Sequence, residues 1–241
     1  MGRWFYIPDQ DELAMTFQIG MVGTNGILLA SDQLATYSAN SYQYPDTSRM
    51  PKIAITQNGR IAYCRAGDRL SIVTGAAIAN SIDQMDEYSA SVKDCVVQAV
   101  YSSSAPVIAG ECKQPDENAE PLRGGSILIA TCKPLGLWRI DVIPGKLPMV
   151  VPILDKAKIG DSNTPAPFFT ESYYSNRPLE ELVFLAAHTV LTAGAMSQWV
   201  KGLDIVLCKP SGCTMLTGQY IKDLTLRSET LRSQISDWLF R

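Results

Sequence analysis

The chain has 241 residues, 46% of them hydrophobic, which suits one substantial core in one domain. Twenty-one Lys and Arg residues stand against 24 Asp and Glu residues, so the formal net charge is −3. We exclude a nucleic-acid partner, because such binding rests on clustered basic side chains. The sequence shows no apolar stretch of about 18 residues and no signal-peptide core, so we predict no membrane partner and a cytoplasmic location.

Short strands and paired helices alternate along the chain. Residues 16–23 alternate apolar and polar side chains, and a second apolar run at 27–30 predicts a hairpin. Because strand pairs alternate with helix pairs, the order favours stacked sheets with helices outside over a doubly wound fold. Further strands are expected at 52–56, 60–64, 126–132, 136–141, 203–208 and 213–216, and helices at about 67–91, 93–102, 178–198 and 221–240.

The sequence has one histidine and six cysteines, without a C-x-x-C pair. A metal site would also be expected to use histidine, and a chain of this length does not need disulfides. We therefore predict no metal and no cofactor, and interpret the cysteines as small buried thiols. These are Cys64, Cys95, Cys112, Cys132, Cys208 and Cys213.

Conventional catalytic motifs are absent: there is no P-loop, no G-x-G-x-x-G, no H-E-x-x-H and no G-x-S-x-G. His188 lies in an apolar helical run and is interpreted as a packed or capping residue, so a Ser-His-Asp triad is not expected. Asp161 and Ser162 follow Gly160 and by themselves are typical of a turn or a helix N-cap.

The most informative pattern begins at Thr16, which opens a strand. Asp32 follows sixteen residues later, and Lys52 precedes an apolar strand. A strand of small residues then ends in Gly-Asp at 67–68, at the start of a helix. In this order the residues resemble the β-type subunits of the proteasome core particle, a family of N-terminal-nucleophile hydrolases. The resemblance covers most of the chain from 16 to about 216.

The resemblance implies an α+β fold, a four-layer αββα sandwich of two mostly antiparallel sheets flanked by helices. It implies one hydrolase domain over 16–241, a C-terminal helix at 221–240, and a propeptide or N-terminal extension at 1–15. It further implies a polypeptide substrate, self-association into rings and an ATPase or unfoldase partner. The charged fraction of 19%, below the roughly 25% of an average soluble domain, agrees with surface buried in an assembly.

The resemblance assigns catalysis to three residues. As residue one, Thr16 would be the nucleophile, and its own α-amine, with an ordinary pKa of roughly 8, would be the general base. Lys52 would lower the pKa of that amine by like-charge repulsion, and Asp32 would hold Lys52 in place. Taken singly, each residue also fits a structural role in a strand or turn.

Substrate contacts follow from the same resemblance. Thr36 would lie on the strand that pairs with the substrate backbone, and Ala62 near the specificity pocket. Cys64 stands where the family has a glycine whose N–H binds the oxyanion.

Several residues around this set depart from the family pattern. Met15 precedes Thr16 where a glycine is common. Asp161 stands where a site serine is expected, with Ser162 beside it, and Ser197 is a shifted substitute for a supporting serine. These departures favour weakened or unusual catalysis.

The register of the first hairpin decides whether Thr16 and Asp32 share a face of the sheet. A two-residue turn at 25–26 would place them on opposite faces and prevent the arrangement. A three-residue loop at 24–26, with Gly26 left-handed, would make them diagonal neighbours roughly 7–8 Å apart. We favour the three-residue loop.

We therefore predict a threonine endopeptidase that hydrolyses unfolded polypeptides once Thr16 is exposed. Two alternatives stay open: a non-catalytic scaffold or binding subunit in which residues 1–15 remain attached, and a hydrolase of the same fold that cleaves small-molecule amides.

Overall fold

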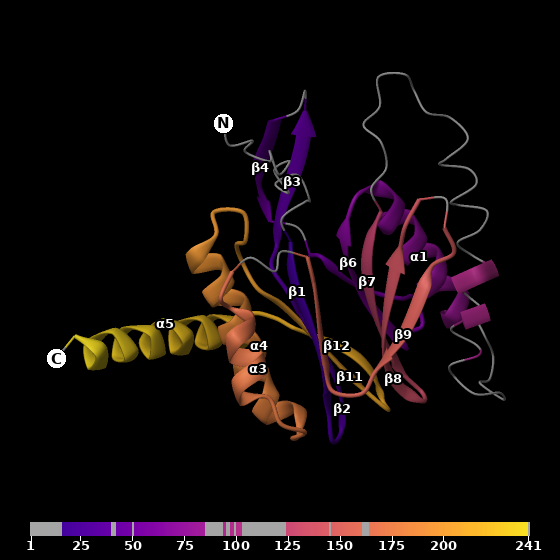
Figure 1. Ribbon diagram of the computed structural model, residues 1–241. Helices are drawn as coiled ribbons and strands as arrows, with labels where there is room; N and C mark the ends of the chain where they lie inside the picture. The colour runs from indigo at the N-terminus through magenta and orange to yellow at the C-terminus, as the bar shows by residue number, and fades with distance from the viewer. Residues whose placement is uncertain are drawn as a thin grey trace, which may run out of the picture.

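The computed structural model describes residues 16–39, 42–49, 51–84, 94, 97–98, 100–102, 124–144, 146–160 and 164–240, with the backbone alone at 35–39, 42–49 and 69. Two antiparallel five-stranded sheets face each other, and helices cover their outer sides (Figure 1). This arrangement confirms the predicted α+β class with stacked sheets.

The elements follow one another in both sheets mostly as hairpins. The first sheet has the order β10 (Lys156–Gly160), β1 (Phe17–Gly23), β2 (Gly26–Ser31), β11 (Asp204–Lys209), β12 (Gly212–Leu216). The second has the order β5 (Ile53–Ile55), β6 (Ile61–Gly67), β7 (Gly125–Cys132), β8 (Leu135–Val142), β9 (Met149–Ile153). A separate ribbon pairs β3 (Leu34–Ala39) with β4 (Tyr42–Arg49). The helices are α1 (Arg69–Asp83), α3 (Pro167–Tyr173), α4 (Leu179–Met196) and α5 (Gln219–Leu239).

The central strands are apolar on both faces because each face meets a different layer. In β2, Leu28 and Ala30 pack in the core beneath α4, whereas Ile27 and Leu29 pack between the two sheets. In the second sheet, Ile127 and Ile129 of β7 likewise turn to the core beneath α1, and Leu128 between them turns to the first sheet. A run of consecutive apolar residues thus predicts a strand buried on both sides.

Helix α4 corrects the statement that the chain has no apolar stretch long enough to span a membrane. Its 18 residues have a mean hydropathy of 1.3, long and apolar enough by that criterion alone to cross a bilayer. Ten of them are buried, and Leu182, Val183, Ala186 and Val190 pack in the core over β1 and β2. The helix is apolar because it forms the main contact with the first sheet.

The expected strands and the last two long helices are confirmed within a few residues of their predicted bounds. The pattern of apolar residues missed five elements: the ribbon β3–β4, where only the resemblance implied a strand at Thr36, the edge strands β9 and β10, and the short helix α3. Pro152 sits in β9, where an edge position tolerates its missing N–H. The expected helix at 67–91 is described as α1 to Asp83. Of the helix expected at 93–102, residues 94, 97–98 and 100–102 are described and are helical, whereas Cys95 and Cys112 lie outside the described residues.

Both predicted registers of the first hairpin are wrong. Gly23 pairs with Gly26, so the turn is Thr24-Asn25, and Gly26 lies in the strand. A Cβ on Gly26 would lie 2.5 Å from the Cys208 carbonyl oxygen, and one on Gly23 would lie 2.7 Å from that of Arg177. The two glycines therefore permit close packing on other segments, rather than a left-handed turn.

Candidate functional site

Thr16, Asp32 and Lys52 meet at one end of the first sheet. The Lys52 ammonium donates a hydrogen bond to Thr16 Oγ1 and another, of 2.7 Å, to Asp32 Oδ2. Thr16 is 6% exposed, the Asp32 side chain is 0% exposed, and the Lys52 side chain is 12% exposed. The structure thus brings together the three residues that were predicted to carry the chemistry.

Asp32 reaches this position because the β1–β2 ladder ends one residue before it. Gln18 and Ser31 form the last pair, and by the parity of that register Asp32 would share a face with Phe17 rather than with Thr16. Beyond Ser31 the chain leaves the strand, and the Asp32 carboxylate accepts the N–H of Phe17 at 3.0 Å. The alternation of side chains along a regular strand pair therefore does not decide whether Asp32 reaches the Thr16 side of the sheet, because Asp32 lies beyond the last pair.

A second carboxylate fixes the backbone that carries Lys52. Asp204, the first residue of β11, accepts the Lys52 N–H at 3.1 Å through Oδ2. Its Oδ1 accepts the Gln33 side-chain amide at 2.6 Å. The segments after β2 and before β5 are thus both tied to β11. The sequence analysis missed Asp204 and Gln33; the one signal was a carboxylate opening an apolar strand.

Burial sets the protonation behaviour of the pair. It lowers the pKa of Lys52 below its ordinary value, an effect opposed by the negative charges of Asp32 and Asp204. Burial likewise raises the pKa of Asp32, opposed by Lys52 and by the N–H groups of Phe17 and Leu34. An ammonium with a lowered pKa beside a hydroxyl can exchange a proton with it near neutral pH more readily than an exposed lysine.

Gly160 allows β10 to approach the backbone of Thr16 closely. It pairs with Phe17, has φ +90°, and a Cβ there would lie 1.7 Å from the Thr16 carbonyl oxygen. No side chain fits this space, so glycine is required on steric grounds at the end of β10.

The predicted substrate residues are less closely grouped. Thr36 lies in β3 opposite Pro45, and only its backbone is described. Ala62 and Cys64 are fully buried in β6, between β5 and β7, in the core between the sheets.

The backbone of Cys64 is used by the sheet. The Arg60 carbonyl accepts the Cys132 N–H of β7, and in this register every second residue, including Cys64, turns its backbone toward β7. The Cys64 N–H therefore points at its partner Leu128 in the sheet, and the role expected of it as an oxyanion donor stays a prediction. Burial also raises the pKa of the Cys64 thiol.

Among the remaining predicted residues, Ser197 is described and lies at the C-cap of α4. Its Oγ accepts the Trp199 N–H at 3.2 Å, which is a local turn contact. Asp161, Ser162 and Met15 lie outside the described residues. His188 is buried, with Nδ1 2.9 Å from Ser228 Oγ, in agreement with the packed role predicted for it.

Comparisons with known proteins identify the fold. No family model matches the chain, and no curated protein matches it. Anbu (ancestral beta-subunit) from Yersinia bercovieri is similar in structure, with 14% identity, a TM-score of 0.65, and coverage of 93% of this chain and 97% of that chain. The Anbu (Gly-1) mutant from Hyphomicrobium sp. strain MC1 has 13% identity, a TM-score of 0.62 and coverage of 92% and 96%. A further Anbu structure from that strain has 13% identity, a TM-score of 0.60 and coverage of 91% and 97%.

At these identities the likeness shows the fold alone, a proteasome-like fold of the N-terminal-nucleophile type. The predicted kinship with proteasome core-particle β-type subunits is wrong, because the structural neighbours are Anbu proteins, a distinct family with a proteasome-like fold.

Proposed function

We propose that this chain is a threonine-type peptidase that cleaves unfolded polypeptides, with Thr16 as nucleophile. One observation carries the proposal: the partly buried Lys52 ammonium contacts both Thr16 Oγ1 and Asp32 Oδ2. A threonine hydroxyl is a weak nucleophile until a nearby base accepts its proton. An orienting carboxylate beside that base completes the usual logic of an activated nucleophile.

The reaction begins with Thr16 as the first residue of a processed chain. Its Oγ1 attacks the scissile carbonyl carbon, and the hydroxyl proton passes to the α-amine or to a neutral Lys52. The tetrahedral intermediate collapses, the leaving amine takes that proton, and an ester joins the acyl group to Thr16. Water then hydrolyses the ester by the same proton route and restores the hydroxyl.

Asp32 keeps Lys52 against the nucleophile throughout. Because its carboxylate also accepts the N–H groups of Phe17 and Leu34, it cannot turn away without leaving buried donors unpaired. Asp204 holds the Lys52 backbone from the other side. The fold supplies orientation, and the low exposure of the site strengthens each charge interaction.

The rest of the proposal concerns organisation. Residues 1–15 form an extension removed before catalysis, and 16–241 form one hydrolase domain, built as a four-layer αββα sandwich. Copies of the chain associate into rings, and an ATPase supplies unfolded substrate. In support, large side chains are exposed at the end of α5: Trp238 is 80% exposed and Phe240 is 87% exposed, as surfaces that a neighbouring copy would cover.

A second candidate function is a non-catalytic scaffold that keeps residues 1–15. It is favoured by Cys64, whose N–H is directed at Leu128 in the sheet and so is not offered to an oxyanion. Without a replacement donor, the rate of peptide hydrolysis would fall by roughly a hundredfold or more.

Intact mass of the purified protein tests the proposal. The wild-type chain is expected to lose residues 1–15, Thr16→Ala to keep them, and Thr16→Ser, which retains a hydroxyl, to lose them at a reduced rate. Thr24→Ala, an exposed threonine in the same hairpin, is the matched control and should process normally.

A chain that begins at Thr16 then tests activity directly. We expect it to degrade a fluorescently labelled unfolded protein and to be labelled at Thr16 by a peptide epoxyketone. An unprocessed wild type, together with no labelling and no hydrolysis by the chain that begins at Thr16, would refute the peptidase and leave the scaffold. Hydrolysis of small anilides without degradation of protein would instead identify a small-molecule amidase.

A further inference from the structure

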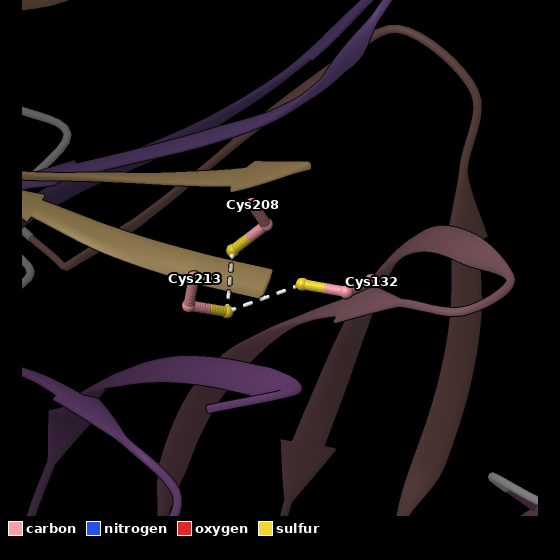
Figure 2. A group of neighbouring side chains, drawn as sticks. All are labelled: Cys132, Cys208 and Cys213. Carbon is pink, nitrogen blue, oxygen red and sulfur yellow. Dashed lines mark hydrogen bonds between the residues drawn. The ribbon is translucent and has the colours of Figure 1, made fainter. Parts of the chain in front are cut away.

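Three cysteines from both sheets converge at the end of the sandwich away from Thr16. Cys132 ends β7, while Cys208 and Cys213 face each other on β11 and β12. Figure 2 shows the three side chains pointing toward one another from these strands. Their Sγ atoms all lie within 4.8 Å of one another, with 3.2 Å between Cys208 and Cys213 and 3.4 Å between Cys132 and Cys213.

The surrounding backbone holds this cluster in place. Lys209 pairs with Gly212 and closes a two-residue turn, so the paired Cys208 and Cys213 are fixed next to it. The Cys213 N–H donates to the Gly59 carbonyl at 2.8 Å, and the Cys132 N–H to the next carbonyl, that of Arg60, at 2.9 Å. The turn between β5 and β6, which contains Gly59 and Arg60, therefore holds the backbone of cysteines from both sheets.

Burial favours a closed site with one route of entry. Cys132 is 2% exposed and Cys208 is 0% exposed, whereas Cys213 is partly exposed and gives access from solvent. All three pack in the core between the sheets with apolar neighbours. Soft thiolates in such surroundings select thiophilic closed-shell cations over Mg²⁺ or Ca²⁺.

We propose that Cys132, Cys208 and Cys213 bind one thiophilic cation, Zn²⁺ or Cu⁺, as three thiolates. Binding releases the three thiol protons to solvent and leaves the sulfurs bonded to a common centre. Among the described residues the cluster offers three ligand atoms and no fourth, so the ion is three-coordinate or takes a fourth ligand from solvent. The expectation of no metal rested on a scarcity of histidine, and a purely thiolate site needs none.

The sulfur separations favour a metal over a disulfide. Zinc–sulfur bonds of about 2.3 Å place thiolates roughly 3.8 Å apart in tetrahedral geometry. The observed 3.2 and 3.4 Å need to widen by only about 0.4–0.6 Å for that geometry. A disulfide needs about 2.05 Å, so two sulfurs would have to approach by more than about 1 Å and the third would stay unused.

The site is separate from the proposed nucleophile. In the pairing of β11 with β2, Asp204 lies opposite Ser31 and Cys208 opposite Ile27. Four residues of strand span roughly 13 Å between the Asp204 and Cys208 positions. A cation there would join the two sheets covalently through their ends, and its loss would leave the residues around Thr16 in place.

Metal content of the full chain tests the proposal. Protein purified without chelator is expected to carry about one Zn²⁺ or Cu⁺ per chain by elemental analysis. After chelator and reductant remove it, Co²⁺ added as a Zn²⁺ probe should give a thiolate charge-transfer band that saturates at one equivalent. Titration with Cu⁺ against a coloured chelator distinguishes the second ion.

Matched variants assign the ligands. Cys213→Ser should weaken binding by roughly a hundredfold or more, since each thiolate carries a share of the affinity. A variant with Cys64→Ala, Cys95→Ser and Cys112→Ser keeps the three ligands and should bind as wild type does. Circular dichroism confirms that each variant is folded before it is compared.

Three results would overturn the proposal. The first is no saturable binding of Zn²⁺, Co²⁺ or Cu⁺ by the reduced, folded wild type. The second is unchanged affinity in folded Cys213→Ser. The third is a wild-type mass lower by two hydrogens, with the cluster thiols blocked to alkylation under non-reducing conditions, which would identify a disulfide instead.

Discussion

Replacing Asp32 by Asn removes one charge and one acceptor from a fully buried group. Its Oδ1 accepts from Phe17 N at 3.0 Å, and its Oδ2 from Leu34 N at 3.1 Å and Lys52 Nζ at 2.7 Å. An Asn can keep its oxygen on the Oδ2 side, but its NH₂ group then meets the Phe17 N–H, leaving a buried donor unpaired at about 1–3 kcal/mol. Breaking a buried ion pair on one side costs about 3–5 kcal/mol, which a neutral Lys52 partly offsets.

We therefore expect Asp32→Asn to lower the free energy of unfolding by about 3–5 kcal/mol. At roughly 2–4 °C per kcal/mol for a domain of this size, the Tm falls by about 6–20 °C. Urea unfolding at pH 7 gives the first quantity and a thermal scan the second. A loss below about 1 kcal/mol would refute the ion pair as a buried, fully hydrogen-bonded unit.

Two controls isolate the cause. Glu181→Gln removes a carboxylate that is 52% exposed and paired with Arg177, which is 61% exposed, and should cost no more than about 1 kcal/mol. Combining Asp32→Asn with Lys52→Met removes both charges, so the double variant should recover part of the stability lost by Asp32→Asn.

Two other predictions concern backbone space and pH. Gly160→Ala places a methyl group against the Thr16 carbonyl, so it should lower the free energy of unfolding by about 3 kcal/mol or more and abolish epoxyketone labelling. Gly59 also has a positive φ but has open space around it, so Gly59→Ala should lower the free energy of unfolding, measured in urea, by only about 1–2 kcal/mol. Burial and, to a smaller extent, the charge of Arg232 lower the pKa of His188 in the folded state. Below about pH 6.5 the unfolded state therefore binds more protons at this residue than the folded state, and the free energy of unfolding falls as the pH falls. Between pH 7 and 5.5 wild type should lose up to about 1 kcal/mol more than His188→Gln, and an equal loss would contradict this reading.

The three residues of the candidate site were assigned through the resemblance, on their order and spacing along the chain, since each taken singly also fits a structural role. Thr16 opens an alternating strand, Asp32 follows the next apolar run, and Lys52 precedes another. Apolar runs predicted the strands because a strand buried on both faces needs apolar side chains at successive positions. The support from Asp204 was not predictable, since its partner Gln33 lies 171 residues away in the chain.

The sequence by itself determined which segments form the buried strands and the long helices, because periodicity and apolar runs are local properties. Only the tertiary structure decided the hairpin register. Gly23 and Gly26 pack against the carbonyl oxygens of Arg177 and Cys208, which lie far away in the chain, so no local pattern reveals these contacts. It also decided that the ladder stops at Ser31, which turns Asp32 toward Lys52 against the parity of the strands. The three-cysteine cluster has the same origin: its ligands are far apart in the chain and meet only when two sheets stack.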